Sequence, residues 1–276
     1  MSFAIRSVLG DSLYQLFSRN GLILVTSMFF VNLIFQIGLS SLFIDMWREF
    51  WPEFVETYPE FEELFGDPEA LYPLAIDMPS SLALAIVVVA ILLMLIVLAV
   101  SIRVFYARDE DTIRTELIFD NIAWVTVNLF VGMVIFGILW FVGLLLLIIP
   151  GIFIYVSLIY FIAVVSVEDR SFIDGFSRSW ALVRGLRFKV FLLFLSVFLI
   201  SLVAAISFAM VTSIVHFVSP MAGTVLDQLW DSLITLYFAA VIAISYRALT
   251  EPVASPDEPA EETPEDLGYT DQDAHW

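Results

Sequence analysis

The residues whose chemistry stands out in this sequence are two carboxylates and a histidine. Asp227 and Asp231 are four positions apart, which places them on one face of a helix, and His216 precedes them. Two like charges at this spacing repel each other, so the pair could hold a cation, share a proton, or act as acid and base on a lipid headgroup. Counting back from Arg247 places Asp231 about one turn inside the membrane surface, which favours a wetted interfacial pair.

A second candidate site follows Glu168, where positive charges gather. Ser171 and Asp174 match a capping box and Gly185 can end a helix, so the sequence predicts a short amphipathic helix within 168–187 in the cytoplasmic headgroup layer. The interpretation we favour is a structural interfacial helix; the alternative is a regulatory or partner-binding site. The residues that could contact anionic lipid headgroups are Arg170, Arg178, Trp180, Arg184, Arg187 and Lys189.

Aromatic residues recur on one face of this predicted helix. Phe172, Phe176 and Trp180 follow each other at four-residue steps. We expect the tryptophan to lie at the depth of the aromatic belt that marks a membrane surface.

Other kinds of site are excluded or disfavoured. The chain has no cysteine, which excludes disulfides, thiolate nucleophiles and the strong zinc motifs. Its sequence contains no phosphate-binding loop of the Gly-Lys-Ser kind and no histidine pair at metalloprotease spacing. We therefore predict no cofactor, no metal and no nucleic-acid partner. Membrane lipids are the predicted partners, and a protein partner is left open.

The elements that position these residues are membrane-spanning helices. Hydrophobic residues make up 61% of the chain and its mean hydropathy is +0.94. Since a span needs about 20 apolar residues, six stretches qualify: 21–43, 81–106, 121–147, 151–167, 190–216 and 225–246. The predicted fold is all-α, a polytopic integral membrane bundle of six transmembrane helices within 21–249, with short interfacial amphipathic helices.

The reversal between the third and fourth spans is predicted at Pro150-Gly151. The interval 121–167 contains no charged residue and no histidine, and it is too long for one crossing. Proline interrupts a helix and glycine accepts the positive φ of a tight turn. We therefore expect a hairpin at this pair, with Gly151 in the left-handed region.

The basic residues orient the bundle. Eleven of the twelve lysines and arginines lie on the side of the amino terminus, and only Arg48 lies on the other. The positive-inside rule then predicts a cytoplasmic membrane protein with both termini in the cytoplasm. The sequence divides further into a cytoplasmic amphipathic helix at 1–20, an acidic and aromatic outer loop at 44–80, and an acidic tail at 250–276.

Two of these segments carry further expectations. In the outer loop, short helices are expected to begin at Pro52, Pro59 and Pro68, because proline is favoured at the first helical position. The tail is acidic and proline-rich, so we expect it to be disordered. The net charge of −18 suits concentrated salt, from which we infer a haloarchaeal source.

One stretch resembles a known family. It is LLLLIIPGIFIYVSLIYFIAVVSVEDRSFIDGFSRSWALVRGLRFKVF, with Pro150-Gly151, Glu168, Arg178-Ser179-Trp180 and Arg184-Gly185 as the matching features. It is similar to the membrane domain of glycerophosphoryl diester phosphodiesterases and to related uncharacterised prokaryotic six-span proteins. The resemblance implies a six-span fold and a membrane location. The activity of those enzymes resides in a separate barrel of about 250 residues, for which the non-membrane segments here are too short, so we expect no phosphodiesterase activity.

Three function classes remain. The favoured one is a non-enzymatic membrane module, acting as a scaffold, in envelope maintenance, or in lipid or partner binding, because the spans lack a constellation of charges. The second is a transporter or channel with a polar site near Asp231 and His216, which a polar cavity reaching the membrane midplane would support. The third is a lipid-headgroup enzyme at the outer interface that uses Asp227 and Asp231.

Overall fold

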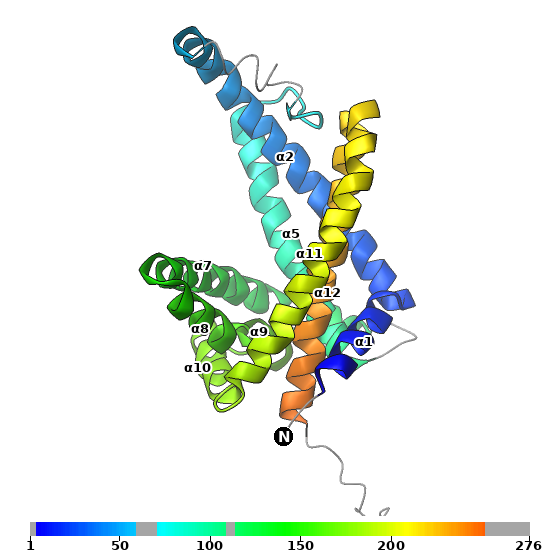
Figure 1. The fold of residues 1–276 in the computed structure, drawn as a ribbon, viewed down its shortest axis with the longest axis vertical. Helices are drawn as coiled ribbons and strands as arrows, with labels where there is room; N and C mark the ends of the chain where they lie inside the picture. The colour runs from blue at the N-terminus through cyan, green and yellow to red at the C-terminus, as the bar shows by residue number, and fades with distance from the viewer. Residues whose placement is uncertain (1–3, 59–70, 109–113, 252–276) are drawn as a thin grey trace, which may run out of the picture.

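The structure, a computed structural model, describes residues 4–58, 71–108 and 114–251, and its regular elements there are helices (Figure 1). Six helical segments are long and apolar enough to cross a membrane: α2 (Arg19–Thr57), α5 (Ser80–Ala107), α7 (Ile122–Leu146), α8 (Ile148–Leu158) with α9 (Phe161–Glu168), α11 (Arg187–Val218) and α12 (Pro220–Thr250). The shorter helices are α1 (Ile5–Leu16), α6 (Thr115–Phe119) and α10 (Phe172–Leu182). The predicted fold class, an all-α protein with six such helices, is confirmed.

The helices pack around α9 and the second half of α12. Helices α2, α5 and α12 contact one another, α11 packs on α12, and α9 packs on α5 and α10. In Figure 1, α2 and α5 rise as one pair and α11 forms a second arm, whereas α7 and α8 extend to the side. The largest fully buried side chains include Tyr160, Phe161 and Tyr246, so the core lies where α9 meets α12.

Serine caps begin three of these helices. The hydroxyls of Ser18, Ser171 and Ser219 accept hydrogen bonds from backbone N–H groups in the first turns of α2, α10 and α12. Such a cap satisfies one of the donors that a helix start leaves unpaired. The helix start predicted at Ser171 is confirmed, but the Asp174 carboxylate accepts from the Ser171 hydroxyl at 2.7 Å and not from its backbone N–H, as it would in a full capping box.

The reversal between α7 and α8 differs from the prediction in its mechanism. The chain turns at Leu147, whose backbone is extended, and Pro150 lies in the first turn of α8, where its missing N–H is no loss. The positive φ expected at Gly151 is wrong, because Gly151 is helical and Gly185 is the glycine with positive φ in the described residues. Gly151 instead serves close packing. A Cβ at Gly143 would lie 2.9 Å from the Gly151 Cα, so both glycines let α7 and α8 touch.

Helix α2 runs further than the predicted first span. It has 39 residues, about 58 Å at the usual helical rise, and therefore extends well beyond a membrane core of about 30 Å. The expectation of a new short helix at Pro52 is wrong, since α2 continues through it. Aromatic rings on successive turns support this extension, with Trp47 and Trp51 centroids 5.1 Å apart. The expected helices at Pro59 and Pro68 lie outside the described residues.

The segment after the outer loop returns along α2. The Trp47 indole donates a hydrogen bond of 3.0 Å to the Tyr72 hydroxyl, and the Ile76 N–H donates one of 2.9 Å to the Ser41 hydroxyl. These bonds tie the α2–α5 pair together at the end that carries Arg48.

At the opposite end, α1 lies against α12. Val8 and Leu16 are buried there, and Asp11 of α1 pairs with Arg108, which ends α5, at 2.8 Å. The amino-terminal helix is therefore part of the bundle.

Candidate functional site

Most of the arginines lie at one end of the bundle, which we call the basic end. It is the end where α5, α9 and α12 finish and where α7, α10 and α11 begin. Two consecutive acids, Glu168 and Asp169, end α9 there. Their side chains reach different helices, and together they organise the basic end.

Asp169 anchors the buried Arg103 of α5. The Arg103 side chain is only 7% exposed, and its Nη2 donates to Asp169 Oδ1 at 2.6 Å. The other Arg103 donors reach the carbonyl oxygens of Leu117, Asp120 and Ser166. The second Asp169 oxygen accepts from the Asn121 amide at 3.1 Å. Both Asp169 and Asn121 have positive φ, a conformation that these two residue types tolerate best after glycine.

Glu168 joins α10 to α12. Its Oε1 accepts a hydrogen bond from Arg178 Nε at 2.7 Å and another from the Tyr246 hydroxyl, while Oε2 pairs with Arg170 Nε at 2.9 Å. The hydrogen bond to Tyr246 raises the pKa of Arg178 despite partial burial, and the Glu168 charge raises it further, so this guanidinium stays positive. Two predicted headgroup residues, Arg170 and Arg178, are thus engaged by a carboxylate of the chain itself.

Helix α10 packs on protein along most of its aromatic face. The Phe176 ring lies 4.8 Å from that of Phe161 in α9, and the Phe172 N–H donates to Asn128 Oδ1 of α7 at 3.0 Å. Trp180, near the end of α10, contacts the Phe153 ring of α8 at 5.5 Å and is 43% exposed. The aromatic face therefore fixes α10 on the hairpin, and only its last turn remains open to the surroundings.

Arg187, the first residue of α11, is held by aromatic rings instead of an acid. Its guanidinium carbon lies 4.7 Å from the Phe153 ring centroid and 4.6 Å from that of Trp180. Because these two rings meet nearly at right angles, the guanidinium occupies the corner between them. Its Nε atom is buried without a hydrogen-bond partner, and the guanidinium makes no hydrogen bond and no ion pair with the described residues.

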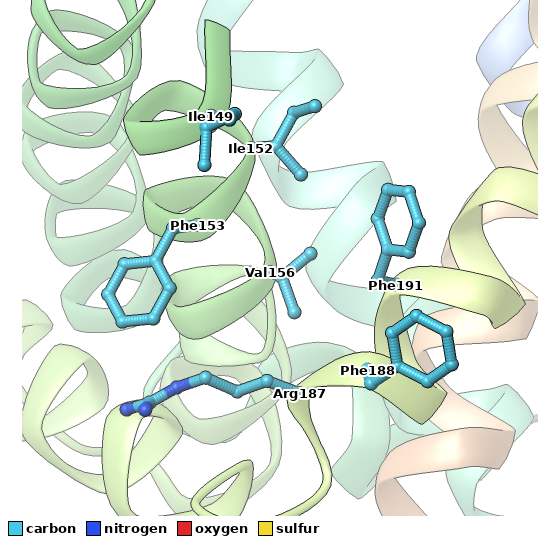
Figure 2. A pocket seen from close by; sticks show the side chains of 7 residues that line it. All are labelled: Ile149, Ile152, Phe153, Val156, Arg187, Phe188 and Phe191. Atoms are coloured by element: carbon cyan, nitrogen blue, oxygen red, sulfur yellow. The ribbon is translucent and has the colours of Figure 1, made fainter. Parts of the chain in front are cut away.

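An apolar groove begins at Arg187 and runs between α8 and α11. Figure 2 shows Arg187 crossing the base of this groove, with its guanidinium beneath Phe153. The groove encloses about 370 Å³. Its lining residues are Ile149, Ile152, Phe153, Val156, Arg187, Phe188 and Phe191. Arg187 is the only one of them with a charged side chain.

The two remaining predicted headgroup residues, Arg184 and Lys189, are close in the sequence to Arg187, which lines the groove. Arg184 is exposed, and its side chain makes no hydrogen bond or ion pair with the part of the chain that the structure describes. Lys189 is half-buried and already interacts with another group of the protein. Of the predicted headgroup residues, Arg187 and Trp180 are those that the structure brings together beside a groove.

The comparison with known proteins yields a family without an assigned activity. The model of a domain of unknown function, DUF7847, matches residues 3–249. The chain belongs to the DUF7847 family. No curated protein and no solved structure matches it. The function of this DUF7847 protein therefore has to be argued from its site.

The predicted outer polar site is only partly assembled in the DUF7847 chain. His216 Nε2 lies 3.4 Å from Asp227 Oδ2, and its Nδ1 lies 3.0 Å from the Thr212 carbonyl oxygen. Both neighbouring atoms are acceptors, so each can accept a hydrogen bond from a ring nitrogen that carries a proton. Asp231 is exposed and forms no ion pair within the described range. The described residues contain no group of three or more acids or histidines that could hold a metal ion.

Sequence reasoning missed the acid pair that organises the basic end. The sequence marks Glu168 only as the start of the basic segment and as a feature of the family resemblance, and Arg103 is only one of the eleven basic residues on the side of the amino terminus. A signal was present, because Glu168 and Asp169 are the first charges after the long uncharged interval 121–167. Arg103 lies 66 positions from Asp169 and Tyr246 lies 78 positions from Glu168, beyond the reach of local patterns.

Proposed function

We propose that this member of the DUF7847 family is a non-enzymatic multi-pass membrane protein that binds a membrane lipid at its basic end. The observation that carries the proposal is the apolar groove between α8 and α11, which ends at a guanidinium with no anionic partner among the described residues. A lipid has the matching two-part character: its chain suits the groove and its polar headgroup suits the charged end.

The arrangement of charges supports a site in the cytoplasmic leaflet. The basic end gathers most of the arginines, while Arg48 lies at the other end, near Asp45 and Asp77. By the positive-inside rule the basic end faces the cytoplasm, and both chain termini belong to that side. The anionic lipids of a cytoplasmic leaflet attract such a surface.

The resemblance to the membrane domain of glycerophosphoryl diester phosphodiesterases extends this proposal. Its matching residues Glu168, Arg178 and Trp180 all take part in fixing α10 on the bundle. We infer that the shared pattern preserves a structural platform, which suits a scaffold or envelope role better than catalysis. The strongly acidic composition supports a protein of a salt-rich setting such as a haloarchaeal membrane.

The test is whether a lipid remains in the groove after purification. The full chain is extracted in a mild detergent and its bound lipids are counted by native mass spectrometry. Ile152→Trp should fill the groove and reduce retention, because Ile152 lines it and is 37% exposed. Ile206→Trp is the matched control, since Ile206 lies on α11 outside the groove and is 58% exposed. Equal retention in both variants, with matching thermal unfolding, would contradict the proposal.

A further inference from the structure

We infer that the groove selects a phospholipid, with one phosphate bound to the Nη groups of Arg187 and one hydrocarbon chain lying between α8 and α11. This inference rests on the proposed function, because it names the class of lipid that the same site takes. It assigns recognition of the headgroup to one residue.

The first support is the contrast between two arginines of the basic end. Arg103 is buried, and its donors reach three carbonyl oxygens and the Asp169 carboxylate. Arg187 has no hydrogen-bond acceptor among the described residues, and its Nε is shielded from solvent. A partly buried guanidinium without an acceptor is costly, and stacking on aromatic rings does not satisfy its N–H groups. The Arg187 guanidinium is therefore suited to bind an anion.

The second support is the geometry of the aromatic corner. Phe153 and Trp180 hold the guanidinium on two adjacent sides, at 4.7 Å and 4.6 Å. The Nε atom is buried, so the Nη amino groups at the tip are the donors left for a ligand. Two such amino groups match two oxygens of one phosphate, a pairing that a planar guanidinium makes and an ammonium does not.

The third support is the apolar lining of the groove, which indicates that the phosphate belongs to a membrane lipid. The lining of the groove is aliphatic and aromatic apart from Arg187, and the neighbouring Phe188 is 74% exposed. A free phosphate or a soluble nucleotide gains nothing from such walls. The site is also the first turn of a helix long enough to cross the membrane, where headgroups lie. A phosphate that carries a hydrocarbon chain uses both parts of the site.

The experiment compares two lipids that differ only in the headgroup. The full chain in detergent is titrated with phosphatidylglycerol and with the diacylglycerol that has the same chains, and binding is measured by native mass spectrometry. The wild-type chain should bind the phospholipid about tenfold more tightly or better, the range expected of hydrogen bonds to a charged group. Inorganic phosphate should not displace the bound phospholipid.

The variants assign this preference to Arg187. Arg187→Gln should abolish the preference, whereas Arg187→Lys should keep only part of it, because lysine retains the charge but not the planar pair of donors. Arg6→Gln is the control, because Arg6 is an exposed arginine of α1 that does not line the groove. Thermal unfolding of each variant shows whether the bundle is intact.

The possible outcomes test three statements separately: that the site recognises phosphate, that the phosphate belongs to a lipid, and that the protein binds a lipid at all. Equal binding of both lipids by the wild-type chain, or an unchanged preference in Arg187→Gln, would refute phosphate recognition while leaving a lipid site in place. Displacement of the phospholipid by inorganic phosphate would refute the lipid as the source of the anion. Binding of neither lipid would refute the proposed function itself.

Discussion

Replacing Asp169 by asparagine should weaken the whole bundle, because this carboxylate neutralises the buried Arg103. Asparagine has nearly the same shape and also tolerates the positive φ at this position, so the change removes the charge without adding backbone strain. Breaking a fully buried ion pair costs about 3–5 kcal/mol. Here the Asp169 side chain is 33% exposed and Arg103 keeps its carbonyl acceptors. We therefore expect a loss of about 2 kcal/mol, in the range of a hydrogen bond to a charged group.

The matched control is Asp11→Asn. Asp11 pairs with Arg108 at 2.8 Å, much as Asp169 pairs with Arg103 at 2.6 Å, but both partners of the control pair are about half exposed. An exposed pair contributes about 1 kcal/mol or less. The assay is equilibrium unfolding of the full chain in mixed detergent micelles, followed by circular dichroism.

A double-mutant cycle tests the cause of the loss. In an Arg103→Met background, the charge of Asp169 no longer has a buried cation to neutralise, so Asp169→Asn should cost about 0.5 kcal/mol or less. If Asp169→Asn costs as much in that background as in the wild-type chain, or no more than Asp11→Asn, then Asp169 does not stabilise the bundle through Arg103.

Two further predictions concern the hairpin and the topology. Gly143→Ala should destabilise the bundle by about 1–3 kcal/mol, because the new Cβ would lie 2.9 Å from the Gly151 Cα. Gly137→Ala should be neutral or stabilising, since its Cβ would meet no atom within 4 Å apart from the adjoining backbone of its own helix. The unfolding assay above compares the two variants. The chain has no native cysteine, so Ser219→Cys at the start of α12 should react with an impermeant thiol reagent in intact cells and Ser7→Cys in α1 should not. The reverse labelling pattern would invert the proposed orientation.

The parts of the fold that depend on local patterns could be predicted from the sequence. Hydropathy over about 20 residues indicated six membrane-crossing helices, because each span must satisfy its own backbone hydrogen bonds. Helix α10 was equally predictable, since the Ser171 cap and the positive φ of Gly185 are set by a few neighbouring residues. In both cases the deciding interactions lie within one or two helical turns.

Two local predictions failed, the first because a contact between two helices decided the outcome and the second because α2 continues through a proline. Gly151 suggested a turn, but its role is to bring α8 against Gly143 of α7, and contact between helices leaves no distinct pattern in either segment. Pro52 suggested a helix start, but α2 continues through it, with the Trp47 and Trp51 rings packed across the adjoining turns. Proline is a weak boundary signal where side chains outside the membrane core support the helix.

The sequence indicated which residues make up the candidate site, but not which of its arginines are bound by acids of the chain and which remain for a ligand. The sequence assigned the headgroup contact to six residues of one segment, since a cluster of arginines beside a tryptophan is typical of a membrane surface. It could not show that Glu168 engages Arg170 and Arg178, because this depends on where α9, α10 and α12 meet.

The acid pair therefore determines which positive charges remain for a ligand. Asp169 neutralises Arg103, and Glu168 engages two further arginines, so these guanidinium groups fix α5 and α10 at the basic end. An anion that took Arg178 would have to displace the Glu168 carboxylate and expose the contact between α10 and α12. Binding at Arg187 displaces no acid of the described residues, among which only the Phe153 and Trp180 rings hold its guanidinium. An anionic lipid is thus expected at Arg187, which aromatic rings orient beside the groove and which no acid among the described residues neutralises.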